Sequence, residues 1–460
     1  MDVVNQANDN IIRFLGGNQR RTKFNKYRWT KYLVRHKIDK GELMVNLLTG
    51  AMVMIRPFEL ANVFTEDPCD YSKYLFESYF LVPEEFDEDR VIEEYVKCNA
   101  KFIDCNYLNN LRSYTILTTT KCNARCFYCY QHHDTTKQHM TEETAAKVAK
   151  YIIETSKYNP SIFIGWFGGE PLYNPDVMDI IASRVRSAGK TIRSSMISNG
   201  YLLTEDMVKR CRYDWGIDNI QITLDGTEEV YNKIKAYIYK DDVNPFKTVI
   251  NNIHNALKEN IAISIRLNCG LKNIDDLFKL VEYLNTEFEN KELLTVYSHH
   301  LFEINNYKLN DEDRDILFNK LIELDNLIAK YNLQSQDHVL GGGIKHIHCM
   351  VDSGEAVTIN PDGSLGLCEH YIDEKSVGHI DNPAVKNYEV IRQWRNKVPY
   401  IDICNDCPLK PSCLKVYGCP DDVRCSISQR DYQINKFKLG LEKQYDKWLH
   451  NLNRCNNCNN

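Results

Sequence analysis

SYTILTTTKCNARCFYCY, residues 113–130, runs from a β-rich segment directly into a loop that carries three cysteines. These residues, which we name the first cysteine cluster, are Cys122, Cys126 and Cys129. Three thiolates in one short loop can hold a metal centre but leave it one ligand short. A [4Fe–4S] cluster bound there would expose one iron to an outside ligand. A structural zinc ion completed by His132 or His133 is the alternative, as is a chance grouping.

Outward from this loop, short β-rich runs alternate with longer amphipathic stretches. The β-rich runs are 113–119, 161–167, 191–198, 219–224, 261–268 and 293–301. Strands that alternate with helices form βαβ units and a parallel sheet, whose ligand site lies at the carboxyl ends of the strands. The pattern predicts an α/β fold with an open, partial (β/α)6 barrel and places the first cysteine cluster at its ligand-binding edge.

The composition is that of a globular protein, with 43% hydrophobic and 26% charged residues in 460. No long apolar run or signal peptide is evident, so we expect a cytoplasmic protein without a membrane span. The net charge of −6 argues against a nucleic-acid partner. Seventeen cysteines are unusual for such a chain, because the reducing cytosol disfavours disulfides, and they indicate metal or redox chemistry.

Changes in composition divide the chain into five predicted segments. These are an N-terminal unit (1–105), the barrel (106–310), a helical connector (311–345), a cysteine-rich domain (346–450) and a polar tail (451–460). In the first unit, Glu42–Arg56 predicts a hairpin that turns at Thr49-Gly50, and Tyr71–Phe80 predicts a helix. We expect the tail to be disordered, although Cys455 and Cys458 stand in it.

Seven further cysteines lie in the cysteine-rich domain at spacings suited to metal binding. They are Cys349, Cys368, Cys404, Cys407, Cys413, Cys419 and Cys425. Seven exceed what one tetrahedral site needs, so two metal centres are indicated. Two iron–sulfur clusters and two structural zinc ions both agree with this number.

The first cysteine cluster, with Tyr128 before its last cysteine, resembles the radical S-adenosylmethionine (SAM) superfamily, whose signature is C-x3-C-x-aromatic-C. The resemblance implies that Tyr128 lies beside the adenine of SAM. After the second strand, Gly168-Gly169-Glu170-Pro171 matches the GGEP segment of the superfamily, which receives the methionine amino group. The residue types suit this role, since the glycines Gly168 and Gly169 allow close backbone approach and Glu170 complements an ammonium.

Later strand ends extend the resemblance. Ser198, at the end of the third strand, is a candidate for the ribose or carboxylate of SAM, and Asp225 belongs to a segment (QITLDG) that resembles the SLDG motif. Arg266 on the fifth strand could meet a carboxylate, although a surface ion pair is an equal alternative. Lys235 stands where relatives often carry arginine, which argues against a bidentate contact there. No residue stands out as a protein-based acid or base.

The seven downstream cysteines resemble the SPASM extension of radical enzymes, which carries two auxiliary [4Fe–4S] clusters. The first half of its pattern fits, but five residues separate Cys413 from Cys419 where three are expected. The resemblance implies that one cluster is held by Cys404, Cys407, Cys413 and Cys425. It implies that the other is held by Cys349, Cys368 and Cys419, with Cys419 and Cys425 exchangeable. Because the second set has three cysteines, its cluster has an open iron or a ligand from elsewhere.

The resemblance also points to a substrate. SPASM enzymes mostly modify peptides, and residues 44–55 and 79–89 resemble the winged-helix-like recognition element of ribosomal-peptide maturases, which binds a leader peptide as an added strand. We therefore expect a radical SAM maturase with three [4Fe–4S] clusters. It would take an electron from a partner such as flavodoxin or ferredoxin and form a thioether or other cross-link in a precursor peptide.

Two other functions remain open. An anaerobic sulfatase-maturing enzyme oxidises cysteine or serine to formylglycine, but such relatives usually begin close to the first cysteine motif, which is Cys122 here. A non-catalytic metal-binding adaptor belongs to another class. Iron and sulfide analysis separates it from the enzyme, because three clusters require about twelve irons per chain.

Overall fold

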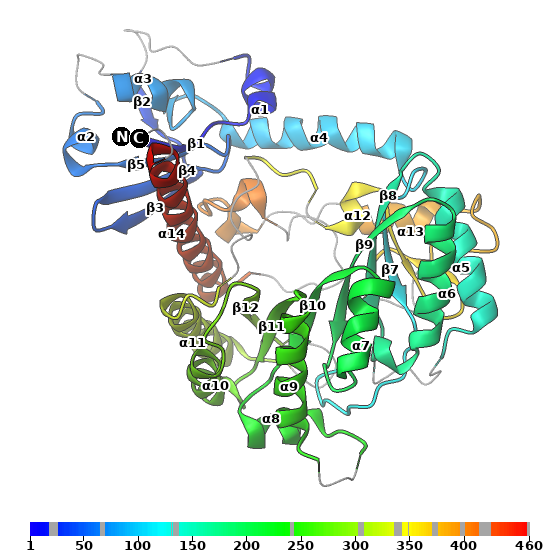
Figure 1. Cartoon of the computed structure of the whole chain (residues 1–460). Helices are drawn as coiled ribbons and strands as arrows, with labels where there is room; N and C mark the ends of the chain where they lie inside the picture. Colours follow the sequence, from blue (N-terminus) through cyan, green and yellow to red (C-terminus); the bar gives the residue numbers. More distant parts are fainter. Residues whose placement is uncertain are drawn as a thin grey trace.

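The computed structural model describes residues 1–17, 26–64, 70–129, 131, 138–239, 243–301, 308–334, 343–347, 349–369, 376–395, 401–413 and 425–457. In Figure 1 an N-terminal module (blue) lies beside a barrel-like α/β unit (cyan to green), and a long C-terminal helix (red) runs between them. None of the helices in these described ranges has the length and apolar character needed to cross a membrane.

Six parallel strands form the predicted sheet, in the order of their sequence. They are β7 (Ser113–Leu117), β8 (Ser161–Phe167), β9 (Thr191–Ser198), β10 (Ile217–Thr223), β11 (Ala262–Cys269) and β12 (Leu294–His300). The helices that accompany them are α5 (Glu142–Thr155), α6 (Pro175–Ser187), α7 (Glu205–Lys209), α8 (Glu228–Lys235), α9 (Pro245–Lys258), α10 (Ile274–Glu287) and α11 (Asp311–Lys330). The prediction of a partial α/β barrel is confirmed.

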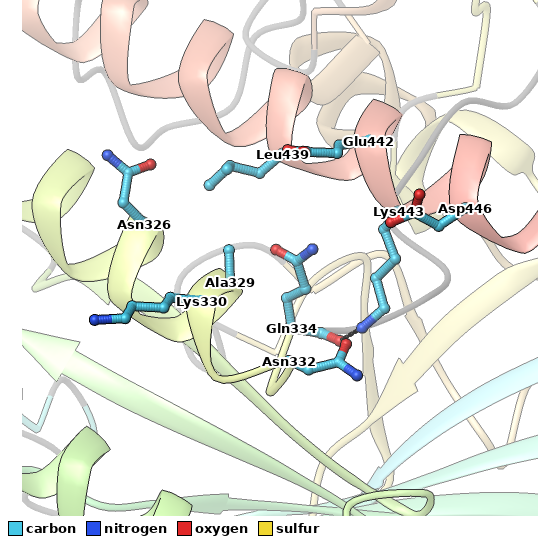
Figure 2. A pocket seen from close by; sticks show the side chains of 9 residues that line it. All are labelled: Asn326, Ala329, Lys330, Asn332, Gln334, Leu439, Glu442, Lys443 and Asp446. Atoms are coloured by element: carbon cyan, nitrogen blue, oxygen red, sulfur yellow. Dashed lines mark hydrogen bonds between the residues drawn. The ribbon is translucent and has the colours of Figure 1, made fainter. Parts of the chain in front are cut away.

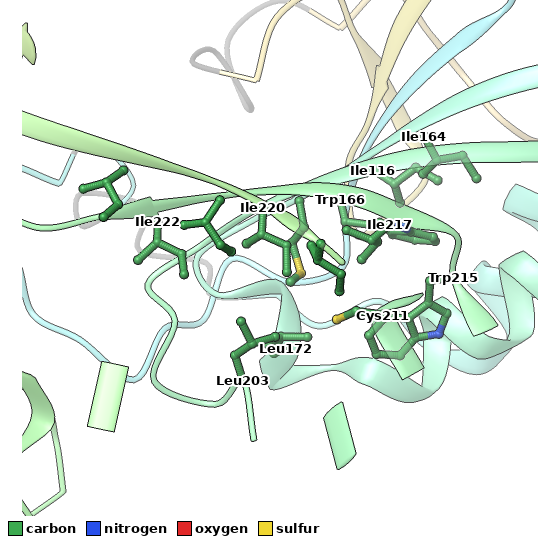
Figure 3. Close-up of a cluster of buried hydrophobic side chains, with 14 of the residues drawn as sticks. Ile116, Ile164, Trp166, Leu172, Leu203, Cys211, Trp215, Ile217, Ile220 and Ile222 are labelled. Carbon is green, nitrogen blue, oxygen red and sulfur yellow. The ribbon is translucent and has the colours of Figure 1, made fainter. Parts of the chain in front are cut away.

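Alternation along the strands explains the core. In β8, Ile162, Ile164 and Trp166 are buried, while the residues between them are more exposed. Figure 3 shows Ile164 and Trp166 on the side of the sheet that packs against Trp215 and other apolar residues from the covering segments. The apolar face of the strand therefore packs against the covering segments. The loops that follow the carboxyl ends of the strands do not take part in this packing and are available for a ligand site.

The sheet does not end at β7. Strand β13 (Ala356–Ile359) pairs with β7 in parallel, and β14 (Ser364–Gly366) and β15 (Gly378–His379) follow it. These strands come from the predicted cysteine-rich domain and were not predicted, because each is a short run between turn residues. Around them lie α12 (Met350–Ser353) and α13 (Tyr388–Arg395). The cysteine-rich part of the chain is thus continuous with the barrel sheet.

The N-terminal module contains the predicted hairpin. Strands β4 (Gly41–Asn46) and β5 (Met52–Ile55) pair in antiparallel fashion, and Gly50 has a φ of 77° in the turn between them. The remaining elements are β1 (Asp2–Asn5), β3 (Leu33–Ile38), the pair β2 (Tyr27–Trp29) and β6 (Leu81–Pro83), and the helices α1 (Asp9–Phe14), α2 (Pro57–Ala61), α3 (Asp70–Glu77) and α4 (Glu88–Asn106). The four-stranded sheet has the order β1-β5-β4-β3.

Helix α14 (Ile427–Asn457) joins the two units. It packs against α11 and β3, and its Leu441 and Tyr445 share an apolar cluster with Tyr32 and Val34 of the module. The expectation of a disordered polar tail is wrong as far as Asn457, since α14 continues through it. Helix α11, assigned to a connector, packs against β12 within the barrel core. The five-segment division itself stays a prediction.

Candidate active site

The first cysteine cluster follows β7, at the predicted edge of the sheet. Its three thiols are partly buried, and the Cys129 backbone N–H donates to the Cys126 carbonyl at 3.2 Å. Burial, together with the charges of Glu170, Cys126 and Cys129, raises the pKa of Cys122 to about 12. The thiols therefore lie close enough to repel one another as anions. A metal centre removes this penalty, because coordinated thiols are deprotonated.

The spacing of the thiols bears on the kind of centre. Among the described residues, no three side chains of His, Cys, Asp or Glu converge closely enough to hold a single metal ion. A zinc site needs such convergence, whereas in a [4Fe–4S] cluster each cysteine binds a different iron. Three cysteines that follow β7 in one loop agree with the ligand set predicted for such a cluster. His132 and His133, named for the zinc alternative, lie outside the described residues.

The predicted GGEP segment packs directly on the cysteine loop. The N–H groups of Gly169 and Glu170 donate to the carbonyls of Thr119 and Lys121, at 2.9 and 3.0 Å. A Cβ at Gly169 would overlap the Lys121 carbonyl oxygen, and Gly168 has a φ of 140°. The glycines are thus required by close approach to the chain's own backbone, which holds the second loop against the first.

Glu170 and Ser198, predicted separately, are in contact. The fully buried Glu170 carboxylate accepts hydrogen bonds from Ser198 Oγ at 2.9 Å, the Asn199 N–H at 2.8 Å and the Leu172 N–H at 3.2 Å. Burial raises the pKa of Glu170 to about 7, against these hydrogen bonds, which lower it. The Ser198 hydroxyl also accepts from the Gly200 N–H at 2.9 Å, so in this structure it serves to fix Glu170.

A second buried group surrounds Tyr128. Its hydroxyl donates to Asp225 Oδ2 at 2.6 Å and accepts from Asn268 Nδ2 at 3.1 Å and Lys235 Nζ at 3.2 Å. Lys235 and Asp225 form an ion pair at 2.8 Å. Burial raises the pKa of Tyr128, and the Asp225 charge raises it further. The predicted Tyr128 and Asp225 are thus brought together by Lys235, which is central to the group.

Sequence reasoning missed two members of the site. Asn268, two residues after the predicted Arg266, contacts both the Tyr128 hydroxyl and Arg266 Nε, the latter at 2.9 Å. Asn199 Nδ2 donates to Asn123 Oδ1 at 2.6 Å inside the cysteine loop. Both asparagines lie near strand ends and close in sequence to predicted site residues. This position is the sequence signal that could have identified them as members of the site. Arg266 lies on β11 and pairs in register with Thr223 of β10.

The downstream cysteines lie at the ends of short elements. Cys404 ends a 3-10 turn, and the N–H groups of Cys407 and Cys413 donate to the Cys404 and Lys410 carbonyls, both at 3.3 Å. Burial raises the pKa of Cys407, and the charges of Cys413 and Cys404 raise it further, so these three thiols are neighbours. Cys425 precedes α14 by two residues.

The second predicted ligand set is only partly described. Cys349 directly precedes α12 and is exposed, whereas Cys368 follows β14 and is partly buried. Cys419 lies outside the described residues. Of the other cysteines, Cys211 and Cys269 are fully buried in the apolar core of the barrel.

One cavity of about 440 Å³ lies between α11 and α14, and Figure 2 shows the side chains around it. Its lining residues are Asn326, Ala329, Lys330, Asn332, Gln334, Leu439, Glu442, Lys443 and Asp446. None of the predicted site residues is among them. The candidate active site is therefore defined by the chemistry of its residues and not by this cavity.

Comparison with known proteins matches the segment of the chain that carries this candidate site. Residues 116–284, which hold the first cysteine cluster and the strand ends around it, match the Radical SAM superfamily. Over this segment the chain is similar to radical SAM domains. A probable GTP 3′,8-cyclase of Methanocaldococcus jannaschii is 32% identical over 177 residues, or 38% of this chain and 55% of that protein. One of Methanococcus maripaludis is 31% identical over 131 residues, or 28% and 42%. The chain thus spans about half the length of these curated relatives.

The radical SAM domain and its surroundings also resemble a solved structure. Native anSMEcpe with bound AdoMet superposes with a TM-score of 0.54 at 18% identity, covering 75% of this chain and 99% of that one. The same protein with AdoMet and the Cp18Cys peptide gives 0.52 at 18% identity, with the same coverage. At this identity the likeness shows the fold alone. A quarter of this chain lies outside it.

Proposed function

We propose that this chain is a radical SAM peptide maturase, which cleaves SAM reductively and removes a hydrogen atom from a ribosomally made precursor peptide to form a thioether or other cross-link. The observation that carries the proposal is the packing of the first cysteine cluster against Glu170 and the strand ends inside the radical SAM domain. When bound there, a [4Fe–4S] cluster supplies the electron that cleaves SAM to methionine and a 5′-deoxyadenosyl radical.

The residues around the cysteine loop fit SAM by their chemistry. Glu170, held by Ser198 and Asn199, complements the methionine ammonium, which would keep the carboxylate ionised. Asp225 Oδ1 is buried and has no hydrogen-bond partner among the described residues. A buried acceptor without a partner is costly, so a donor group on the bound molecule would satisfy it. Arg266 offers a planar fork for the carboxylate.

Two auxiliary clusters complete the proposed cofactor set. Cys404, Cys407 and Cys413 are neighbours, which supports one cluster completed by Cys425. The other would use Cys349, Cys368 and Cys419. If its fourth iron is open, it can bind a substrate thiolate, which favours a thioether as the product.

The peptide substrate is supported by the N-terminal module. Strands β1 and β3 stand at the two ends of its sheet, so each has one edge without a partner strand in the described sheet. An extended peptide can add to such an edge through backbone hydrogen bonds. A solved structure with a similar fold binds the Cp18Cys peptide, which agrees with peptide chemistry on this fold. The electron donor would be a flavodoxin or ferredoxin.

The test is anaerobic incubation of reconstituted, reduced protein with SAM and a cysteine-containing peptide encoded beside its gene. Release of 5′-deoxyadenosine and a product lighter by two hydrogen atoms are expected. An unchanged peptide, with no SAM cleavage, would refute the proposal. Wild-type protein with zinc and no iron would favour the adaptor.

Formylglycine formation is the second candidate, because the similar fold covers 99% of anSMEcpe. A sulfatase-derived peptide that contains cysteine distinguishes it. Loss of the cysteine sulfur with a new aldehyde would identify the sulfatase-maturing activity, whereas a retained sulfur in a cross-link identifies the maturase. The quarter of the chain outside the likeness favours the maturase, since the second activity does not account for it.

A further inference from the structure

Phe127 stands between Cys126 and Tyr128 in the cysteine loop, and its side chain is exposed. The residue is 55% exposed, although phenylalanine is among the residues most often buried in folded proteins. Its neighbour Tyr128 directs its hydroxyl to the buried Asp225 and Asn268. The loop therefore presents an apolar ring at the surface, directly beside a cysteine that we propose as a cluster ligand.

The exposed ring is held in place by its neighbours. It packs edge to face against the Tyr128 ring, with the centroids 5.4 Å apart and an angle of 81° between the planes. Lys272 Nζ lies 6.0 Å from the centroid of the Phe127 ring. The loop backbone is fixed as well, because the Arg125 N–H donates to the Lys235 carbonyl at 2.7 Å. A side chain that is already ordered loses little entropy when a partner binds it, which suits a docking contact.

Three cationic side chains belong to the same part of the surface. Arg125 and Lys272 are exposed, and Lys121 is half-buried. Arg125 Nη1 donates to the carbonyls of Cys122 and Ala124, at 2.7 and 2.8 Å, which holds the guanidinium on the loop. The exposed side of the cysteine loop is thus cationic, in a chain whose net charge is −6.

Within the described ranges of the chain, no carboxylate forms an ion pair with any of these three cations. Asp275, three residues after Lys272, pairs instead with Lys320 at 2.5 Å. Asp225 is buried and pairs with Lys235 at 2.8 Å. A local excess of one charge attracts a partner of the opposite charge and helps to orient it. The charges therefore favour an acidic partner.

We propose that Phe127, Lys121, Arg125 and Lys272, which we name the loop surface, form the docking site for an acidic one-electron carrier protein. The inference rests on the proposed function and adds to it the place where the reductant binds. Electron transfer weakens steeply with distance, so the carrier has to approach the cysteine loop closely. One electron passes from the carrier, which is oxidised, to the cluster, which is reduced, and no bond or proton changes place. Small, weak interfaces are typical of such redox encounters, which agrees with one aromatic anchor among charges.

The first test measures binding without catalysis. Oxidised flavodoxin and oxidised plant-type ferredoxin, both acidic carriers, are titrated into the anaerobic holoprotein at low salt by isothermal titration calorimetry. The wild type should bind at least one of them, and its affinity should fall as salt screens the exposed charges. Lys272→Glu should raise the Kd on the order of tenfold. Lys279→Glu, the same change at an exposed residue of α10, should leave it near the wild-type value.

The second test separates the carrier from the peptide substrate. SAM cleavage is driven either by the reduced carrier at limiting concentration or by dithionite, a small reductant that needs no docking site. With the carrier, Lys272→Glu and Phe127→Ala should be slower on the order of tenfold. With dithionite, their rates and their iron content should match the wild type. If Phe127→Ala loses iron, Lys272→Glu decides.

An equal loss of rate with dithionite in iron-loaded Lys272→Glu would overturn the inference, because the loop surface would then serve SAM or the peptide. Wild-type affinity of Lys272→Glu for the carriers would overturn it too, as would the failure of the wild type to bind either carrier. Wild-type protein that does not cleave SAM with dithionite would instead refute the proposed function.

Discussion

The hydroxyl of Ser198 donates a hydrogen bond of 2.9 Å to the carboxylate of Glu170, which joins the ends of β9 and β8. Both residues are buried, and the Asn199 N–H binds the other carboxylate oxygen at 2.8 Å. Two loops that were predicted independently from the sequence are therefore joined by hydrogen bonds. The Glu170 carboxylate at their junction allows the proposed binding of SAM to be tested.

Binding of SAM should depend on pH through Glu170. Burial raises the pKa of this carboxyl to about 7, so below that pH it is mostly protonated and pairs poorly with an ammonium. We expect the affinity for SAM to rise as the pH increases through about 7, measured by equilibrium dialysis on anaerobic holoprotein. In Glu170→Gln the affinity should be low and nearly independent of pH. The same pH profile in both proteins would contradict the role of Glu170.

The same group should affect stability. The folded-state pKa of Glu170 lies above its ordinary value of 4.5, so the folded state binds more protons than the unfolded state between these two values. Its contribution is fully present below about pH 4.5 and is lost as the pH rises to about 7. A tenfold difference in proton affinity between the two states corresponds to about 1.4 kcal/mol. The melting temperature of Glu170→Gln minus that of the cluster-free wild-type protein should therefore increase as the pH rises from about 4.5 to about 7. A difference that does not change with pH would contradict this prediction.

Replacing each residue of the first cysteine cluster by alanine should abolish SAM cleavage, because the loop has no spare ligand. Loss of one cluster lowers the iron content by about four per chain. Release of 5′-deoxyadenosine and iron analysis measure the two effects. Cys98→Ala is the control, since Cys98 is an exposed cysteine on α4. Activity that survives in the Cys126→Ala protein would exclude the proposed site.

Gly169→Ala should be more damaging than Gly165→Ala. A Cβ at Gly169 would lie 2.6 Å from the Thr120 carbonyl oxygen, which is backbone and cannot move freely. At Gly165 the nearest atom, Thr115 Oγ1, is 3.6 Å away, which is an ordinary contact. Overpacking typically costs about 1–3 kcal/mol. Thermal unfolding should show a clear loss for Gly169→Ala only, and equal melting temperatures would show that the two loops separate easily.

The ion pair between Lys410 and Asp89 should couple the cysteine-rich domain to the N-terminal module. Lys410 Nζ lies 2.6 Å from Asp89 Oδ1, and Lys31 and Tyr32 also contact this carboxylate. Burial raises the pKa of Asp89, but these three partners outweigh it and hold the pKa at about 2. The contact should therefore persist at neutral pH and weaken only as the pH falls from about 3.8 towards 2.

Lys410→Ala tests this coupling by hydrogen exchange. Faster exchange is expected in α4 and in residues 401–413, because Asp89 loses a partner that is 7% exposed. Arg90→Ala is the matched control, since Arg90 is an exposed residue of the same helix that pairs with Glu94. Equal exchange in the two variants would show that the ion pair does not hold the units together.

The sequence alone determined the barrel and predicted several residues of the candidate site. Six β-rich runs with alternating burial became β7 to β12, because periodicity along a strand is a local property. The first cysteine cluster, Glu170 and Ser198 were predicted for a similar reason, since ligand loops of parallel sheets follow strand ends. Motif spacing within one short segment needs no knowledge of distant contacts.

Only the tertiary structure decided how these parts meet. The ion pair of Lys235 with Asp225, the contact of Ser198 with Glu170 and the addition of β13 to β7 each join residues that are distant in the chain, the last by more than 200 positions. Helix α14 likewise binds β3 through apolar packing that no local pattern specifies. Such contacts form because buried charges need partners and apolar faces need to be covered once the helices and strands have formed. Which partners are available depends on the assembled molecule and not on any local segment.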